Sequence, residues 1–255
     1  MNADVPTAQL IAIMLGAARA GAWMMLCPPF NSRLIPSTVK ALLSVGLALP
    51  MSPYLMASIP SMRTWDIVAS AALQVFIGAA LGFVTLLLFA AIQAAGDLID
   101  VFGGFTLSMA YDPLSQNQSS IFGRFYNLVA VTLLFATPGH QLILRGFLQT
   151  FRTLPLDASF SMGTLNALLT RGIADMFVSA LQIAAPLLAV LFLTDIAFGL
   201  LNRVAPALNA FQLGFPAKIF LVLTLGGTAI AILPGALDTI VRQAVAAVLK
   251  LGGGG

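Results

Sequence analysis

The stretch GDLIDVFGGFTLSMAYDPLSQNQSSIFGRF, from Gly96 to Phe125, decides how the rest of the chain is interpreted. It follows the longest uncharged run of the sequence, Ile67 to Gly96, and brings two acids, a Gly-Gly pair, an Asp-Pro pair and a polar run directly after it. Irregular polar backbone beside a helix of bilayer length is tolerated only where protein buries it or where it lines a watery cavity. We therefore expect a loop that lies inside a conduit.

The composition is that of an integral membrane protein. The 255 residues are 59% hydrophobic and only 8% charged, with a mean hydropathy of +0.98, whereas charged residues make up roughly a quarter of a soluble domain. The net charge of +3 is the mild basic excess of membrane loops, and no Lys/Arg run or RNA-type aromatic motif predicts nucleic acid binding. The single cysteine, Cys27, excludes an internal disulfide and a cysteine metal cluster.

The pattern of charges predicts about six hydrophobic helices, because each span needs about 20 mostly apolar residues. Two spans are weak: Val5 to Leu26 contains Arg19, and Ala41 to Met62 contains three prolines, which disfavour a helix interior. The first ten residues lack the positive start of a cleaved signal, so we expect them in the mature chain. The four stronger spans are Ile67 to Gly96, Phe125 to Leu144, Met176 to Thr194 and Ile219 to Leu237.

Two shorter patterns add local expectations. Gly78 and Gly82 form a G-x-x-x-G motif, which lets helices approach closely, either within this chain or against another subunit. After Thr137-Pro138-Gly139, polar residues recur at helical spacing opposite apolar ones until Pro155. That segment predicts an amphipathic helix at an interface, with its polar side facing solvent or lipid headgroups.

The carboxy-terminal third is apolar but contains Asp195, Arg203 and Lys218. A charge at the bilayer centre costs roughly 2.5 to 3.5 kcal/mol on the insertion scale, so we expect these residues to face protein, water or partner chains. Asp195 and Arg203 are about 12 Å apart along a straight helix, too far to neutralise each other. A short amphipathic helix is predicted over the last residues, from about Ile240. Four prolines are expected to break the helices of this region: Pro186, Pro206, Pro216 and Pro234.

We find no motif for enzyme chemistry. The sequence has no nucleotide-binding loop, zinc-protease motif or nucleophile elbow, and one histidine with scattered aspartates makes a hydrolytic triad or zinc site improbable. No cofactor is expected. Asp97 and Asp100 share one helix face by their spacing of three. They would either line a cation or proton path or mark a wet helix end, and we favour the wet helix end.

Three linked motifs resemble the FliR family of flagellar export-gate proteins over nearly the full chain, with virulence type III secretion counterparts more distant. The motifs are GDLIDVFGGFTLSMAYDP from Gly96, LLFATPGHQLILRGFLQTFRTLP from Leu133, and AAPLLAVLFLTDIAFGLLNRVAPALNAFQLGFPAKI from Ala184. One position departs from the pattern, because Ala207 stands where the family usually has a glutamine.

The resemblance implies a non-enzymatic subunit of an all-α, helical hetero-oligomeric export gate in the bacterial inner membrane, at the flagellar basal body. Implied partners are FliP-like and FliQ-like subunits, FlhB-like and FlhA-like export proteins, unfolded flagellar export substrates and membrane lipid. The loop from about Phe105 to Ser119 would plug the channel, and Asp97, Asp100, Asp195, Arg203 and Lys218 would be buried or face subunits. The implied plug and channel residues are Gly103, Gly104, Phe105, Leu107, Met109, Tyr111, Asp112 and Pro113.

We expect a single membrane-embedded domain over residues 1–255. It would comprise N-terminal helices over 1–66, a long helix plus plug loop over 67–125, and C-terminal helical hairpins over 126–255. Two other functions stay open at this point. A stand-alone secondary transporter would use Asp97, Asp100 and Asp195 for ion coupling, and an intramembrane enzyme would need a nucleophile and a base that the motifs do not supply.

Overall fold

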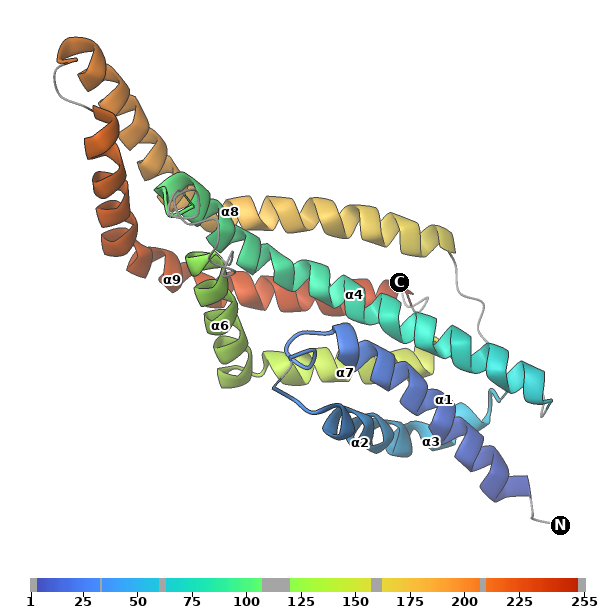
Figure 1. The fold of residues 1–255 in the computed structure, drawn as a ribbon. Coiled ribbons are helices and arrows are strands. Elements are labelled where there is room, and N and C mark those ends of the chain that lie inside the picture. The colour runs from blue at the N-terminus through green and yellow to red at the C-terminus, as the bar shows by residue number, and fades with distance from the viewer. Residues whose placement is uncertain are drawn as a thin grey trace, which may run out of the picture. The chain divides into compact units, whose positions relative to one another are not determined.

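The computed structural model describes residues 4–32, 34–59, 63–106, 120–156, 162–206 and 210–251. Every element of regular secondary structure in these ranges is a helix (Figure 1). This confirms the predicted all-α class. Within the described ranges, five helices are long and apolar enough to cross a membrane, or six if α6 and α7 count as one span. The elements are α1 (Asp4–Leu26), α2 (Ser37–Ala48), the 3-10 turn η1 (Leu49–Met51), α3 (Ser52–Met56), α4 (Thr64–Gly103), α6 (Ile121–Ala136), α7 (Gly139–Thr153), α8 (Met162–Val204) and α9 (Ala210–Leu251).

The chain forms two compact units, and each is described by itself. The first unit consists of Met1–Phe89, Pro138–Ile173 and Ile240–Gly255, and the second of Ala90–Thr137 and Ala174–Thr239. One boundary falls between α6 and α7, and the other three fall inside α4, α8 and α9, so each of these long helices contributes a part to both units.

In the first unit, α4 packs against α1 through the G-x-x-x-G motif. A side chain at Gly78 would collide with the backbone carbonyl of Arg19, and a Cβ at Gly82 would lie 2.8 Å from the carbonyl oxygen of Trp23. The small residues therefore let the two helix backbones approach closely. Of the two readings of this motif, the structure supports packing within the chain.

The amphipathic helix predicted before Pro155 is α7, and its apolar side is buried in the first unit. The ring of Phe147 stacks on Trp23 of α1 with centroids 4.2 Å apart, and Gly146 lies against Val245 of α9. The polar side is exposed as expected, at Gln141, Arg145, Gln149 and Arg152. The apolar side of α7 thus packs on protein.

The prediction that four prolines break the last helices is wrong at three of them. Helix α8 continues through Pro186, and α9 continues through Pro216 and Pro234, while Pro206 lies in the break between the two helices. All three prolines lie on exposed sides of their helices, and membrane helices tolerate an internal proline more readily than soluble helices do. The short helix predicted from Ile240 is therefore the end of α9.

Candidate functional site

Three of the predicted plug residues lie at the end of α4, in the second unit. Gly103 is the last residue of α4, and Gly104 and Phe105 follow it in a turn. The other five, Leu107, Met109, Tyr111, Asp112 and Pro113, lie outside the described residues. The structure therefore gives the geometry of the two ends of the predicted plug segment.

The turn after α4 requires glycine at residue 104. Gly104 has φ +85°, a left-handed conformation that glycine adopts without a Cβ penalty. A Cβ there would also lie 2.8 Å from the ring of Phe215 in α9, and one at Gly103 would lie 3.0 Å from a methyl of Val222. The end of α4 is thus seated on α9 by close contact.

Helix α6 begins against α4 almost backbone to backbone. A Cβ at Gly96 would lie 2.5 Å from the carbonyl carbon and oxygen of Phe122, and one at Gly123 would collide with the side chains of Asp97 and Ser120. Glycine at both positions therefore permits the two helices to meet here.

Asp100 bridges this junction. Its Oδ2 accepts hydrogen bonds from the backbone N–H groups of Phe122 at 2.9 Å and Gly123 at 3.4 Å, and Ser120 Oγ also accepts from Gly123 N at 2.8 Å. The first N–H groups of a helix lack intrahelical partners, and a carboxylate there is stabilised by the helix dipole. Asp100 therefore caps a helix other than its own.

The predicted acid pair has two different environments. Asp100 is 1% exposed, and its second oxygen, Oδ1, has no hydrogen-bond partner among the described residues, like the buried hydroxyl of Tyr126. Asp97 is partly exposed, beside Gly123. Among the described residues, no three His, Cys, Asp or Glu side chains are grouped to hold a metal ion.

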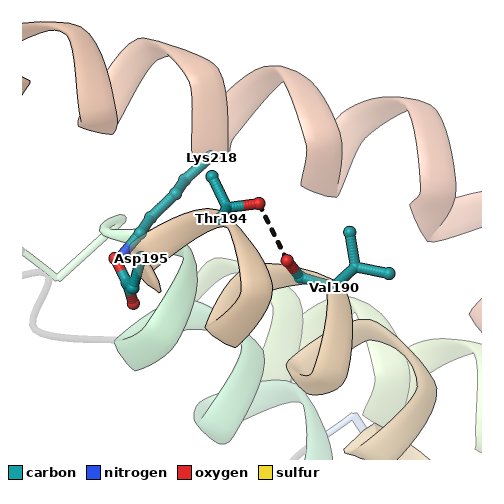
Figure 2. Close-up of polar contacts among 4 residues, drawn as sticks. All are labelled: Val190, Thr194, Asp195 and Lys218. Carbon is teal, nitrogen blue, oxygen red and sulfur yellow. Dashed lines mark hydrogen bonds and ion pairs between the residues drawn. The ribbon is translucent and has the colours of Figure 1, made fainter. Parts of the chain in front are cut away.

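Asp195 of α8 and Lys218 of α9 form an ion pair, with Oδ1 and Nζ 2.5 Å apart. Figure 2 shows the lysine reaching from α9 toward the aspartate, while Thr194 bonds back to the carbonyl of Val190 in its own helix. Lys218 is 14% exposed and Asp195 49% exposed, so the pair is open to its surroundings on the aspartate side.

The ion pair borders a pocket of about 330 Å³ between α8 and α9. The pocket is lined by seven residues: Asp195, Phe198, Gly199, Asn202, Gly214, Phe215 and Lys218. Phe215 is the same ring that covers Gly104, so the pocket and the seat of the α4 turn share one side chain.

Arg203 was the only partner considered for Asp195 from the sequence, and Lys218, which is the partner in the structure, was not identified. A signal was present: Pro206 lies 11 residues after Asp195 and 12 before Lys218, and a hairpin that reverses near Pro206 places the two side by side. Arg203 is exposed in the last turn of α8, where a cation is favoured by the helix dipole.

Arg19 forms a second buried polar cluster, in the first unit, and its side chain is 0% exposed. Its Nε donates to Gln74 Oε1 at 2.6 Å, and its Nη1 and Nη2 donate to the carbonyls of Thr150 at 3.2 Å and Leu154 at 2.8 Å. Leu154 O lies just after α7, where carbonyls lack intrahelical donors, whereas Thr150 O also accepts from Leu154 N at 2.9 Å. The contacts explain how a span contains an arginine.

Comparison with known proteins places the chain in a family. The family described as "Bacterial export proteins, family 1" matches residues 10–244. The flagellar biosynthetic protein FliR of Pectobacterium carotovorum subsp. carotovorum is 33% identical over 78% of this chain and 77% of its own length. FliR of Escherichia coli strain K12 is 31% identical over 82% and 78%, and FliR of Bacillus subtilis strain 168 is 29% identical over 82% of each. The chain therefore belongs to the bacterial export proteins of family 1 and, within them, to the FliR family of flagellar biosynthetic proteins.

Proposed function

We propose that this chain is a pore-forming subunit of the flagellar type III export gate in the bacterial inner membrane. In this role it helps to form and plug the channel through which unfolded flagellar substrates pass. FliP-like and FliQ-like subunits are its proposed neighbours in the gate, with FlhB-like and FlhA-like proteins beside them. Membership in the FliR family supports the export role. The exposed surface of α8 and α9 in the second unit supports a place among other subunits.

The observation that carries the proposal is the mixed surface of α8 and α9. Large apolar side chains are exposed along α8 at Phe192, Leu193, Ile196 and Leu200, within the same stretch that displays the half-exposed Asp195. Lipid alone would solvate the apolar groups but not the charge. Neighbouring subunits, which offer both apolar and polar surface, suit this face better.

The transporter alternative needs carboxylates that are free to bind and release an ion. Asp195 is paired with Lys218, and one oxygen of Asp100 caps α6. Both groups thus have structural partners of the kind expected in a fixed scaffold, which favours the export-gate proposal.

The plug role is tested by deleting residues 108–119 in the assembled gate and measuring ion leakage across the membrane. The proposal predicts raised leakage from the deletion and, to a smaller extent, from Leu107→Ser with Met109→Ser, because apolar bulk would be lost. Ser115→Ala is the matched control and should leave leakage unchanged. If the deleted gate assembles and leaks no more than the intact gate, the plug role is wrong.

A further inference from the structure

We propose that Asp100 is a positioning residue that ties the end of α4 to the start of α6 and so holds the two ends of segment 107–119 together. The tie itself is inferred from contacts within the second unit. Its effect on leakage rests on the proposed plug function. Asp100 is in this view neither an ion-coupling acid nor a wet helix end.

Asp100 supplies a part of the cap of α6 that the N-cap residue of α6 itself does not supply. Ser120 already accepts from Gly123 N at 2.8 Å, a shorter contact than the 3.4 Å from Gly123 N to Asp100. The contact that Asp100 alone supplies is the 2.9 Å bond from Phe122 N. Because this bond joins residues 22 apart in sequence, its role is to connect two helices.

The bond is well placed to hold these helices. Asp100 is 1% exposed, and hydrogen bonds to ionised acceptors are roughly twice as strong as neutral ones. One turn earlier on α4, Gly96 lies against the backbone of Phe122 and Gly123 with no room for a Cβ. A carboxylate that reaches the first N–H groups of α6 from this position leaves the two backbones little freedom to separate.

Aromatic contacts join the same two ends a second time. The rings of Phe105, which precedes the segment, and Phe122, which follows it, meet edge to face with centroids 5.3 Å apart. Both ends also lie beside α9: Gly104 lies against the ring of Phe215, and the ring of Phe122 lies near Gly226, where an added Cβ would be 3.8 Å from it. The entry and exit of the segment thus rest on one frame, and Asp100 is its charged link.

The test compares three variants in the assembled complex, after native mass spectrometry has shown that each is incorporated. Asp100→Ala removes the tie, Asp100→Asn keeps an acceptor oxygen, and Ser120→Ala removes a cap of α6 while Asp100 stays in place. Amide hydrogen exchange at Phe122 reports the tie directly, and ion leakage reports its consequence. If Asp100→Ala does not assemble, Asp100→Ser, whose side chain is too short to span the gap, takes its place.

We expect Asp100→Ala to speed amide exchange at Phe122 by about tenfold or more, the effect of losing a hydrogen bond to a charged group, and to raise leakage. Asp100→Asn should restore most of the protection from exchange and the low leakage. Ser120→Ala should leave both the amide exchange at Phe122 and the leakage near the parent values. A helix-capping effect alone would instead make Ser120→Ala resemble Asp100→Ala, which would overturn the proposal.

Three further outcomes separate this proposal from the plug role. Unchanged exchange at Phe122 in Asp100→Ala would overturn the tie, whatever the leakage. If exchange rises but leakage does not, while deletion of 108–119 does raise leakage, then Asp100 does not position the plug and the proposal is wrong. If the deletion leaves leakage unchanged, the plug role fails by itself, and exchange at Phe122 still confirms or overturns the tie.

Discussion

Arg19 of α1 donates a 2.8 Å hydrogen bond from Nη2 to the carbonyl oxygen of Leu154, the residue that follows α7. The same guanidinium bonds to Thr150 O and Gln74 and lies 4.8 Å from the centroid of the Phe151 ring. A planar fork with several donors can serve such divergent acceptors at once, whereas an ammonium group cannot. The arginine therefore fastens α7 to α1 and α4.

Replacing Arg19 should destabilise the protein strongly. We expect Arg19→Met to lower the free energy of unfolding by about 3 kcal/mol or more, because Gln74 Oε1 and Leu154 O lose the donor that Arg19 supplies and Thr150 O keeps only its bond from Leu154 N. Arg19→Lys should recover only part of this loss. Thermal unfolding in mild detergent measures it.

The matched control is Arg152 on the exposed side of α7, which bonds to Tyr54 Oη and lies over its ring. Arg152→Met should cost no more than about 1 kcal/mol, as is usual for exposed charged pairs and cation–π contacts. Equal losses for the two arginines would contradict the role assigned to Arg19.

The contact between α1 and α4 predicts a strong effect of side-chain size at residue 78. Gly78→Val would place its side chain in the backbone of Arg19 and should cost at least about 2 kcal/mol by forcing the helices apart. Gly46→Ala is the control, since a Cβ at Gly46 meets nothing within 4 Å. That change should be neutral or stabilising by up to about 1 kcal/mol through helix propensity, and thermal unfolding compares the two.

The presence of a helix and its apolar side could be predicted from the sequence, because they follow from periodicity and the positions of charges, but most of the helix bounds could not. The expected span from Phe125 to Leu144 is divided between α6 and α7, and the spans Met176 to Thr194 and Ile219 to Leu237 are parts of the longer α8 and α9. The run from Ile67 to Gly96 falls within α4, and α7 ends at Thr153, just before Pro155. The prolines were misleading because a membrane helix tolerates an internal proline more readily than a soluble helix does. Pro186 in α8 and Pro206 between helices look alike in sequence.

The candidate site was only partly visible in the sequence. The spacing of Asp97 and Asp100 places them on one helix face, but the partners of Asp100 are the backbone N–H groups of Phe122 and Gly123. Backbone partners have no residue type and therefore leave no sequence signal. Lys218 was detectable as the partner of Asp195 only once the reversal near Pro206 was recognised.

The Asp195–Lys218 pair predicts an asymmetric mutant cycle. Asp195→Asn leaves the mostly buried Lys218 without its partner and should destabilise by about 1 kcal/mol or more. Adding Lys218→Met removes the unpaired charge and should recover part of the loss. Unfolding of the single and double variants in detergent gives the coupling, and additive losses would show that the pair is not coupled.

Cys27 should not react with polar thiol reagents in the folded protein. The side chain is 0% exposed, and burial raises the pKa of the thiol well above its usual range, although a hydrogen bond with Thr85 lowers it in part. Because the thiolate is the reactive form, raising the pH from 7 to 9 should leave a polar maleimide unreacted until the protein is unfolded.

A cysteine at a highly exposed position provides the control for that experiment. Leu34 is 91% exposed, so the double variant Cys27→Ala with Leu34→Cys should label readily, and faster as the pH rises. Rapid labelling of Cys27 itself in the folded chain would contradict the burial described for the start of the loop after α1.

The most direct test of the account is the mass of the assembly that contains this chain. The chain is co-expressed with the FliP-like and FliQ-like proteins of its own organism, purified in mild detergent and weighed by native mass spectrometry. The account predicts one defined hetero-oligomer that includes this chain, with α8 and α9 covered by the neighbouring subunits. A stable, monodisperse chain that binds neither partner would contradict the export-gate proposal.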